Sequence, residues 1–222
     1  MNSKLAVVLS LSMALASQVA CASNSVPKEV AATTTSSPTL LSASAEGNLK
    51  SLNSLLKSKV DVNAKDGKGY TALMVAASNG HRDAVKLLLD NKADVNIKND
   101  DGQTALYMAL IAEQSDVALD LINHGANIDD VTGDNESALL IATTANQNAV
   151  MSVLIKKKSA LVNKASNSGT TPLMEAARFG TAKTVTMLLK AGADKKAKNQ
   201  SGKTPLDIAI KAQNDDAAKL LK

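Results

Sequence analysis

Residues 66–98 read DGKGYTALMVAASNGHRDAVKLLLDNKADVNIK, and the pattern of this stretch returns along the chain. The tripeptide Thr-Ala-Leu begins at Thr71, and its counterparts begin at Thr104, Ser137, Thr171 and Thr204. The successive spacings are 33, 33, 34 and 33 residues. A fixed period of about 20 to 50 residues indicates a stack of similar supersecondary units. The chain is therefore predicted to be a repeat array.

Each unit contains two short runs of apolar residues with helical spacing. In residues 66–98 the first run is Leu73, Ala76 and Ala77, and the second is Val85, Leu88 and Leu89. Residues spaced at i, i+3 and i+4 lie on one face of a helix. A turn such as Asn79-Gly80 separates the two runs. Each unit is thus predicted to be a pair of short helices, each with one apolar face.

A capping residue precedes the first helix of each unit. The hydroxyl group of Thr71 is expected to accept a hydrogen bond from a free backbone N–H group. Pro172 and Pro205 follow the cap in two units, where a missing N–H donor costs nothing. Gly69 supplies the turn before the cap, and Asn135 replaces it in the fourth unit because Asn tolerates the same left-handed conformation. These residues predict where the first helices begin.

Aromatic residues are almost absent from a chain that is otherwise rich in apolar ones. Of 222 residues, 45% are hydrophobic, yet the aromatic residues are only Tyr70, Tyr107 and Phe179. The hydrophobic fraction is too high for a wholly disordered chain. Small side chains suit thin layers of helices that approach closely. The composition therefore favours a folded chain with a thin core of Ala and Leu.

These motifs resemble the ankyrin repeat, which carries D-x-x-G-x-T-P-L-H-x-A-A near its start and L-L-x-x-G-A-D-V-N near its end. Residues 66–73 and 92–96 follow this pattern closely, and working back by 33 residues places Pro38 at an earlier cap position. The resemblance implies an all-α ankyrin-repeat solenoid of about six helix-turn-helix units with short β-turn or hairpin tips. The ankyrin-repeat domain would span 38–222, with units at 38–65, 66–98, 99–131, 132–165, 166–198 and 199–222.

The chain departs from the family pattern in two places that matter. No unit has the family's His three residues after the capping Thr, and Tyr107, which stands there in the third unit, is predicted to lie in the core. The fourth unit has Ser137 as its cap, one inserted residue and a run of three Lys at 156–158. We therefore predict irregular stacking near residues 156–165.

The N-terminus has the anatomy of a signal peptide. One basic residue, Lys4, precedes an apolar run at residues 5–16, and small residues at Ala20 and Ala22 suit cleavage before Ser23. Residues 1–22 are thus predicted to be a signal peptide and residues 23–37 a disordered Ser/Thr-rich leader. The alternative is a lipoprotein anchored through Cys21, although Gln18 replaces the apolar residue usual at that position. We expect a periplasmic or secreted protein with no transmembrane segment in the mature chain.

The sequence offers no pattern typical of an enzyme. It contains two His, His81 and His124, and one Cys, so a zinc site is not expected. The segment at Gly202 imitates the end of a phosphate-binding loop, but Ala197 stands where its first glycine is required. No nucleophile motif is present. We expect no catalytic residue, no metal and no cofactor.

Charge is distributed unevenly along the chain. Residues 23–131 carry 10 basic and 14 acidic side chains, for a net charge of −4, whereas residues 132–222 carry 14 and 7, for +7. Such polarity can steer an oppositely polarised partner, although a merely solvated charged surface explains it equally well. Only two Arg and few aromatic residues disfavour nucleic acid as the partner.

Members of the ankyrin family bind other proteins through their turn tips and first helices, which line a concave surface. The resemblance therefore implies a protein-binding site on this surface. The residues at its variable positions are Lys68, Tyr70, Asp100, Asp101, Gln103, Ile111, Asp134, Glu136, Arg178, Phe179, Lys203 and Lys211. Tyr70, Ile111, Arg178 and Phe179 are the best anchor candidates because the repeat does not require them. Isolated exposed apolar residues are also common without any function.

The first functional hypothesis is a non-enzymatic protein exported to the periplasm that holds, protects or inhibits a protein partner. An immunity-type inhibitor of a secreted toxin is one version of it. The alternative is a secreted effector that binds a host protein. A third hypothesis, of a different class, is a catalytic or substrate-carrying envelope protein. We expect the protein to be a monomer.

Overall fold

The computed structural model describes residues 39–130 and 132–222. The predicted signal peptide, 1–22, and the predicted leader, 23–37, lie outside the described residues. Leu40–Lys222 forms one compact unit. The described residues form twelve α-helices, one 3-10 helix and no strand, with an isolated β-bridge between Lys65 and Thr71 at the base of one hairpin. The prediction of an all-α fold is confirmed.

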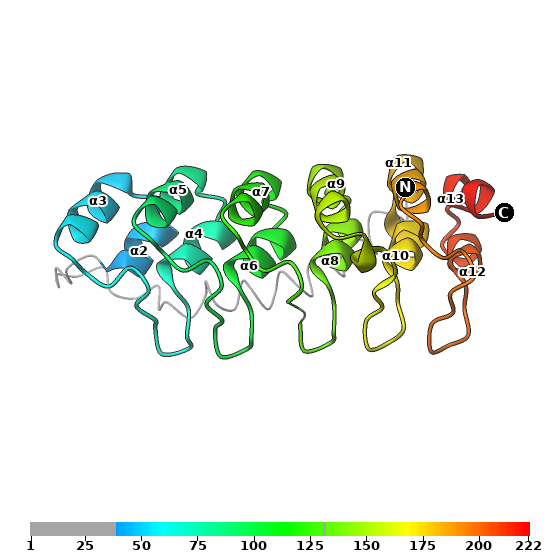
Figure 1. Ribbon diagram of the computed structural model, residues 1–222, viewed down its shortest axis with the longest axis horizontal. Coiled ribbons are helices and arrows are strands. Elements are labelled where there is room, and N and C mark those ends of the chain that lie inside the picture. Colours follow the sequence, from blue (N-terminus) through cyan, green and yellow to red (C-terminus); the bar gives the residue numbers. More distant parts are fainter. Residues whose placement is uncertain (1–38, 131) are drawn as a thin grey trace, which may run out of the picture. The chain divides into compact units, whose positions relative to one another are not determined.

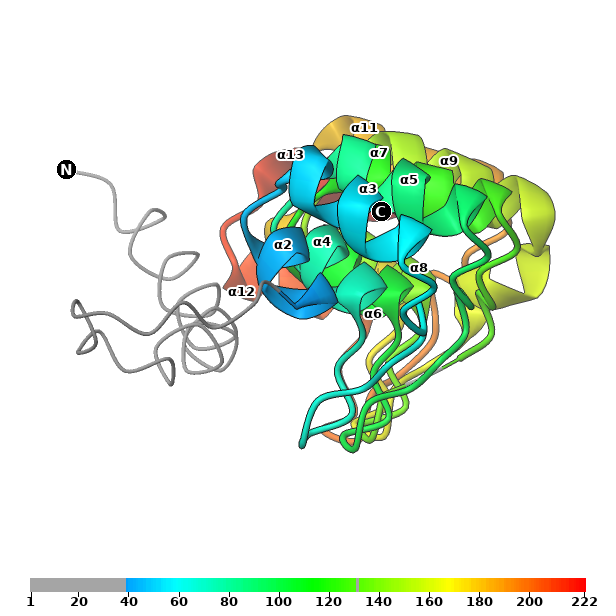
Figure 2. The same ribbon diagram turned by 90° about the vertical axis from the view of Figure 1, so that its left-hand side faces the viewer.

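The helices form two rows, which Figures 1 and 2 show from two directions. The inner row holds the first helix of each unit: α2 (Leu40–Ala45), α4 (Ala72–Ser78), α6 (Ala105–Ile111), α8 (Ala138–Thr144), α10 (Pro172–Phe179) and α12 (Pro205–Lys211). The outer row holds the second: α3 (Leu49–Lys57), α5 (Arg82–Asp90), α7 (Ser115–Asn123), α9 (Asn148–Lys157), α11 (Ala182–Lys190) and α13 (Asp215–Leu221). Hairpin loops join the units and project together from one edge. We call the surface of the inner helices and hairpins the inner face.

The inner helices begin where the sequence predicts. The Thr71 hydroxyl oxygen accepts a hydrogen bond from the Met74 backbone N–H group at 3.3 Å, and the caps of α6, α8, α10 and α12 act in the same way. Pro172 and Pro205 occupy the first positions of α10 and α12. Asn135 adopts a φ of 59°, as expected for a residue that replaces glycine in this turn. Local capping chemistry thus sets the start of each unit.

The core is a thin layer of Ala and Leu between the two rows. One Ala in the middle of each inner helix after α2 is fully buried: Ala76, Ala109, Ala142, Ala176 and Ala209. The inner helices pack against one another in chain order from α2 to α12. A larger side chain at these positions would push adjacent helices apart. The near absence of aromatic residues is therefore a consequence of how closely the layers stack.

The predicted irregularity at residues 156–165 is confirmed. After α9 the chain forms a 3-10 helix, η1 (Ser159–Asn163), which has no counterpart in the other units. This helix packs against α9 and α10 and buries Leu161 and Val162. The inserted residue is thus taken up in an extra turn. None of the helices in the described ranges is long and apolar enough to cross a membrane.

Candidate protein-binding site

The predicted binding residues lie in two rows on the inner face. The hairpin row consists of Lys68, Tyr70, Asp100, Asp101, Gln103, Asp134, Glu136 and Lys203. The second row lies at the C-terminal ends of the inner helices and consists of Ile111, Arg178, Phe179 and Lys211. An inner helix of seven residues separates the rows by about 10 Å. A partner must therefore cover at least this width to contact both rows.

A short polar side chain closes most of the hairpins and holds the variable residues in place. The Asp66 carboxylate accepts hydrogen bonds from the backbone N–H groups of Lys68 and Tyr70, both at 2.9 Å. Asn99, Thr132 and Asn199 accept the equivalent pairs in their own hairpins. These residues were not among the predicted site residues. The sequence did contain a pattern that could have identified them, because a polar residue lies five positions before each capping residue.

Tyr70 is half-buried where the second hairpin meets the third. Burial raises the pKa of its hydroxyl, the charge of Asp101 raises it further, and a hydrogen bond with the Asn99 side chain opposes both effects. The Tyr70 ring therefore packs against the edge of the core, with its hydroxyl group near Asn99 and Asp101 of the next hairpin. A ring fixed in this way loses little entropy on binding, which suits an anchor residue.

Tyr107 packs against the core without being fully buried in it, so the prediction that it lies in the core holds only in part. The residues at the same position in the second, fourth and fifth units are buried: Met74, Leu140 and Met174 are 1%, 3% and 0% exposed. Tyr107 is only half-buried and lines a crevice between the third and fourth units. Burial raises the pKa of its hydroxyl group, and the Gln103 side chain at the edge of the crevice partly opposes this shift.

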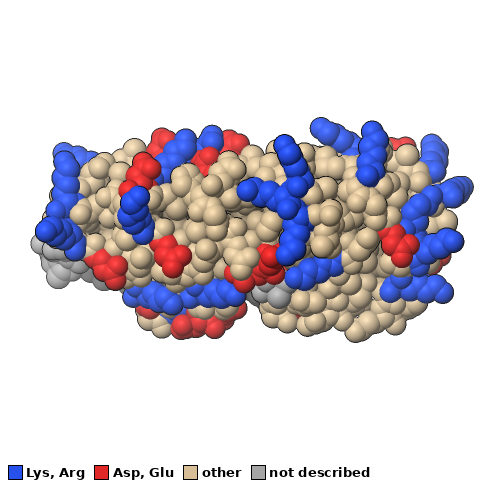
Figure 3. Space-filling view, in the orientation of Figure 1, with Lys and Arg blue, Asp and Glu red and all other residues tan. Residues whose placement is uncertain are grey.

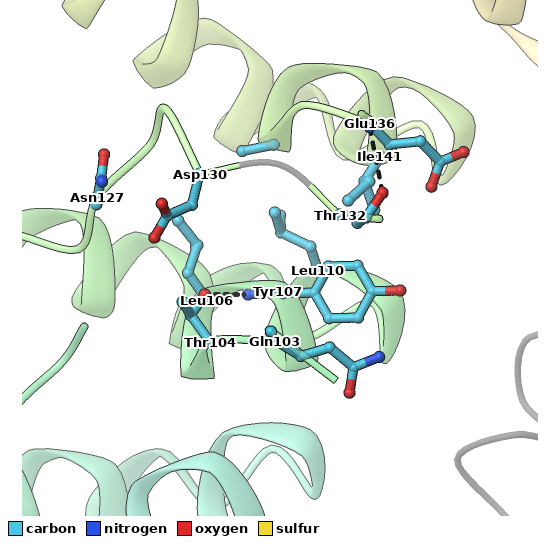
Figure 4. Close-up of a pocket in the computed structure, with 12 residues that line it drawn as sticks. Gln103, Thr104, Leu106, Tyr107, Leu110, Asn127, Asp130, Thr132, Glu136 and Ile141 are labelled. Carbon is cyan, nitrogen blue, oxygen red and sulfur yellow. Dashed lines mark hydrogen bonds between the residues drawn. The ribbon is translucent and has the colours of Figure 1, made fainter. Parts of the chain in front are cut away.

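Glu136 stands across the crevice from Tyr107 (Figure 4). In this view the Tyr107 hydroxyl group and the Glu136 carboxylate point toward the same side, while Leu110 and Ile141 lie between their backbones. Burial raises the pKa of Glu136, and the nearby charge of Asp134 raises it further. Burial also raises the pKa of Tyr107, and the Glu136 charge adds to this shift. The crevice therefore combines an apolar interior with an acidic edge.

Arg178 and Phe179 form the anchor pair of the second row. The guanidinium carbon of Arg178 lies 5.6 Å from the centre of the Phe179 ring, within the range of a cation–π contact. The Asn146 side chain also donates a hydrogen bond to the Phe179 carbonyl oxygen at 3.1 Å. Glu175 lies one helical turn before Phe179. Burial raises the pKa of Glu175, and the Arg178 charge opposes that shift.

Both His residues are bound to backbone carbonyl oxygens. His81 Nε2 lies 3.0 Å from the Ala45 oxygen, and His124 Nδ1 lies 2.7 Å from the Asp120 oxygen. Within residues 39–130 and 132–222, no group of three or more His, Cys, Asp or Glu is arranged to hold a metal ion. His81 thus links the second unit to the first, whereas the contact of His124 stays within its own helix.

The charge polarity of the sequence is visible on the surface. Figure 3 shows Lys and Arg side chains gathered over the C-terminal units. Arg82 pairs with Asp120 at 2.6 Å, Lys98 with Asp130 at 2.9 Å and Lys158 with Asp129 at 2.6 Å. In the part of the chain that the structure describes, no Lys after Lys164 forms an ion pair. Apart from Lys158, the basic residues of the C-terminal half therefore form no ion pair with a described residue.

Comparison with known proteins agrees with this architecture. A family model for ankyrin repeats, in three copies, matches residues 40–132 and 121–199. No curated protein matches the chain. The chain is similar to the immunity protein Bd3460, solved in complex with the predatory endopeptidase Bd0816 from Bdellovibrio bacteriovorus: the identity is 38%, the TM-score is 0.76, and 85% of this chain and 98% of that chain are covered.

A second solved structure, an ankyrin repeat domain (ABAYE2397) from Acinetobacter baumannii AYE, is 29% identical with a TM-score of 0.74. The match covers 82% of this chain and 95% of that one. The repeat period, the two rows of helices and the matched residues all lead to one family. The chain belongs to the ankyrin-repeat proteins.

Proposed function

We propose that the chain is a non-enzymatic protein exported to the periplasm that binds a protein partner through its inner face and inhibits it. The version we favour is an immunity-type inhibitor of an endopeptidase. One observation carries this proposal: the chain is 38% identical to an immunity protein that was solved in complex with an endopeptidase, across 98% of that protein's length. The stacked helix pairs of this chain give it a backbone similar to that of the immunity protein, with a TM-score of 0.76.

The inner face supports the binding part of the proposal. Tyr70 and Phe179 are half-buried: the Tyr70 ring packs against the edge of the core, and the Phe179 ring lies 5.6 Å from the Arg178 guanidinium carbon. Aromatic residues of this kind often dominate the binding energy of an interface. The hairpins between them carry acidic side chains at Asp100, Asp101 and Asp134. A partner with apolar pockets and a basic surface would complement this face.

The N-terminal sequence supports export. The apolar run at residues 5–16 and the small residues Ala20 and Ala22 suit a signal peptide that is removed before Ser23. The mass of the mature N-terminus distinguishes this cleavage from lipidation at Cys21, because a lipidated chain retains Cys21 and carries acyl groups.

Capture of the partner tests the proposal. The tagged chain is crosslinked in intact cells of its own source and recovered separately from periplasm and culture medium. We expect one protein to be enriched from the periplasm and mass spectrometry to identify it as a peptidase. Its hydrolysis of a peptide substrate should stop when an equimolar amount of the chain is added. A double variant, Tyr70→Ala with Phe179→Ala, should bind it at least about tenfold more weakly.

The control variant is Lys86→Ala with Lys183→Ala, which changes two exposed side chains on the outer helices α5 and α11. It should bind as tightly as the unchanged chain. Equal binding by the aromatic double variant would contradict the inner-face assignment. Recovery from the culture medium alone would contradict the periplasmic proposal and favour an effector that binds a host protein. Turnover of a substrate by the chain without a partner would contradict the non-enzymatic role.

A further inference from the structure

The hairpins of the third and fourth units lie farther apart than those of other neighbouring units. At three junctions a backbone N–H group of one hairpin donates a hydrogen bond to a carbonyl oxygen of the preceding hairpin. These pairs are Asp100 with Lys68 at 3.1 Å, Asn167 with Asp134 at 2.8 Å and Gln200 with Ser168 at 3.0 Å. At the junction between the third and fourth units, which we call the third junction, the equivalent residues are Gly133 and Asp101. The structure shows no such bond between these two described residues.

The glycines before the caps give an independent measure of the same separation. A Cβ atom added to Gly69 would lie 3.0 Å from Asn99 Cα, and one added to Gly169 would lie 3.0 Å from Asn199 Cα. One added to Gly102 would have no atom within 4 Å. The third hairpin therefore has open space where the second and fifth hairpins touch the next unit. The crevice of Figure 4 opens at this junction.

The crevice joins an apolar interior to an acidic lining, in which Asp130 is paired with Lys98 and Glu136 has no cation partner. Leu106, Leu110 and Ile141 line its interior, and Gln103, Tyr107 and Glu136 lie at its edge. Glu136 is half-buried and forms no ion pair with any described residue. Its charge therefore loses part of its hydration without gaining a cation in return. A cationic ligand would supply the missing counter-charge.

Glu175 adds a second carboxylate in the same electrostatic environment. The equivalent positions of the other units after the first hold aliphatic side chains or Met: Val75, Met108, Ile141 and Ile208. Packing in this fold therefore does not require an acid at this place. Glu175 is half-buried, has no ion pair among the described residues, and lies near enough to Glu136 for the Glu136 charge to raise its pKa.

We propose that a basic side chain of the protein partner, most favourably that of an arginine, binds across the mouth of this crevice. The proposal rests on the protein-binding function proposed above. The guanidinium group would lie at the mouth of the crevice, against the Tyr107 ring and facing Glu136. Arginine suits such a place because its planar cation stacks on an aromatic ring and bonds carboxylates in two directions. An apolar side chain would instead bury two carboxylates without any compensating charge.

A small probe tests the site without the partner. The ¹⁵N-labelled chain is titrated with N-acetyl-arginine methylamide and, separately, with N-acetyl-citrulline methylamide, which has nearly the same shape and no charge. We expect the arginine probe to shift the amide signals of Tyr107, Glu136 and Ile141 and to saturate on the order of millimolar concentration. The citrulline probe should bind about tenfold more weakly. Equal shifts by both probes, or shifts confined to other acidic residues, would overturn the proposal.

Matched variants sharpen the test. Glu136→Gln with Glu175→Gln keeps both shapes and removes both charges, so the arginine probe should bind about tenfold more weakly. Glu113→Gln with Asp90→Asn removes two exposed charges elsewhere and should leave binding within about twofold. Dispersed amide spectra show that each variant is folded. If the first variant is folded and binds the probe like the unchanged chain, the site is refuted.

The outcomes separate this site from the proposed function. A probe that fails to bind refutes the arginine site even if a peptidase is captured from the periplasm. A probe that binds as expected supports the site even if the captured partner is not a peptidase.

Discussion

The second and third units are joined differently from the third and fourth. At the first of these junctions the Asn96 side-chain oxygen accepts a hydrogen bond from the Asn127 backbone N–H group at 2.8 Å, and Arg82 holds Asp120 through two bonds of 2.6 and 3.0 Å. At the junction between the third and fourth units, Asp129 occupies the position that is equivalent to Asn96. It pairs instead with the Lys158 side chain at 2.6 Å, and both side chains are 46% exposed. A bond to the backbone is thus replaced by a solvated ion pair.

The difference follows from one inserted residue in the fourth unit. The spacing from Ser137 to Thr171 is 34 residues, and the 3-10 helix η1 takes up the extra one. The backbone that would meet Asp129 is therefore in a different conformation from its counterparts. Because each unit of a solenoid contacts only its neighbours, a change of this kind stays local to one junction. On its other side Gln147 still spans this junction, because it donates a hydrogen bond to the Leu110 carbonyl oxygen at 2.7 Å. The comparison teaches that a binding crevice can be made by loosening a single junction.

The largest expected effect concerns how unfolding spreads along the stack. Leu88 in α5 is fully buried, and Leu88→Ala should lower the free energy of unfolding by about 2 to 5 kcal/mol. If the open junction separates two cooperative parts, the first three units should lose protection while the last three keep it. Hydrogen exchange with mass spectrometry measures both halves. Equal loss of protection in all six units would contradict a weak third junction.

An intermediate effect is expected from two glycines in the same register. Gly69 and Gly102 have φ values of 80° and 75°, so alanine costs backbone strain of about 1 to 2 kcal/mol at either place. Gly69→Ala must also displace the backbone of Asn99, whereas Gly102→Ala meets open space. Gly69→Ala should therefore lower stability more than Gly102→Ala in urea unfolding. Equal losses would show that the third and fourth hairpins are no farther apart than the second and third.

The smallest expected effect depends on pH. Burial raises the pKa of Glu175, so the ionised form is less stable in the folded chain than in the unfolded one. Stability is thus lost as the pH rises through this raised pKa, and Glu175→Gln should stabilise the fold at pH 7 by less than about 1 kcal/mol. The gain should vanish below the ordinary pKa of Glu, where the unchanged residue is also neutral. Urea unfolding at pH 7 and pH 4 measures it, and an equal gain at both values would contradict the assignment.

Most of the fold could be predicted because its determinants are local. A Thr hydroxyl group bonds an N–H group three residues away, and the apolar faces follow from spacing within one helix. The site residues could be placed by register, since each unit repeats the same backbone. The position of Tyr107 could not be predicted, because its burial depends on how closely the next unit approaches. Glu175 was not predicted as a site residue, although the sequence marks it: it is the one acidic residue at a position where the other units after the first have apolar residues.

The sequence by itself determined the period, the start of each inner helix, the thin Ala and Leu core and the irregular fourth unit. These features depend on residues that lie within one unit. Only the tertiary structure decided that the hairpins of the third and fourth units lie apart, that Tyr107 lines a crevice, and that Glu136 and Glu175 form no ion pair. The physical reason is that contact between units depends on the relative placement of whole helix pairs.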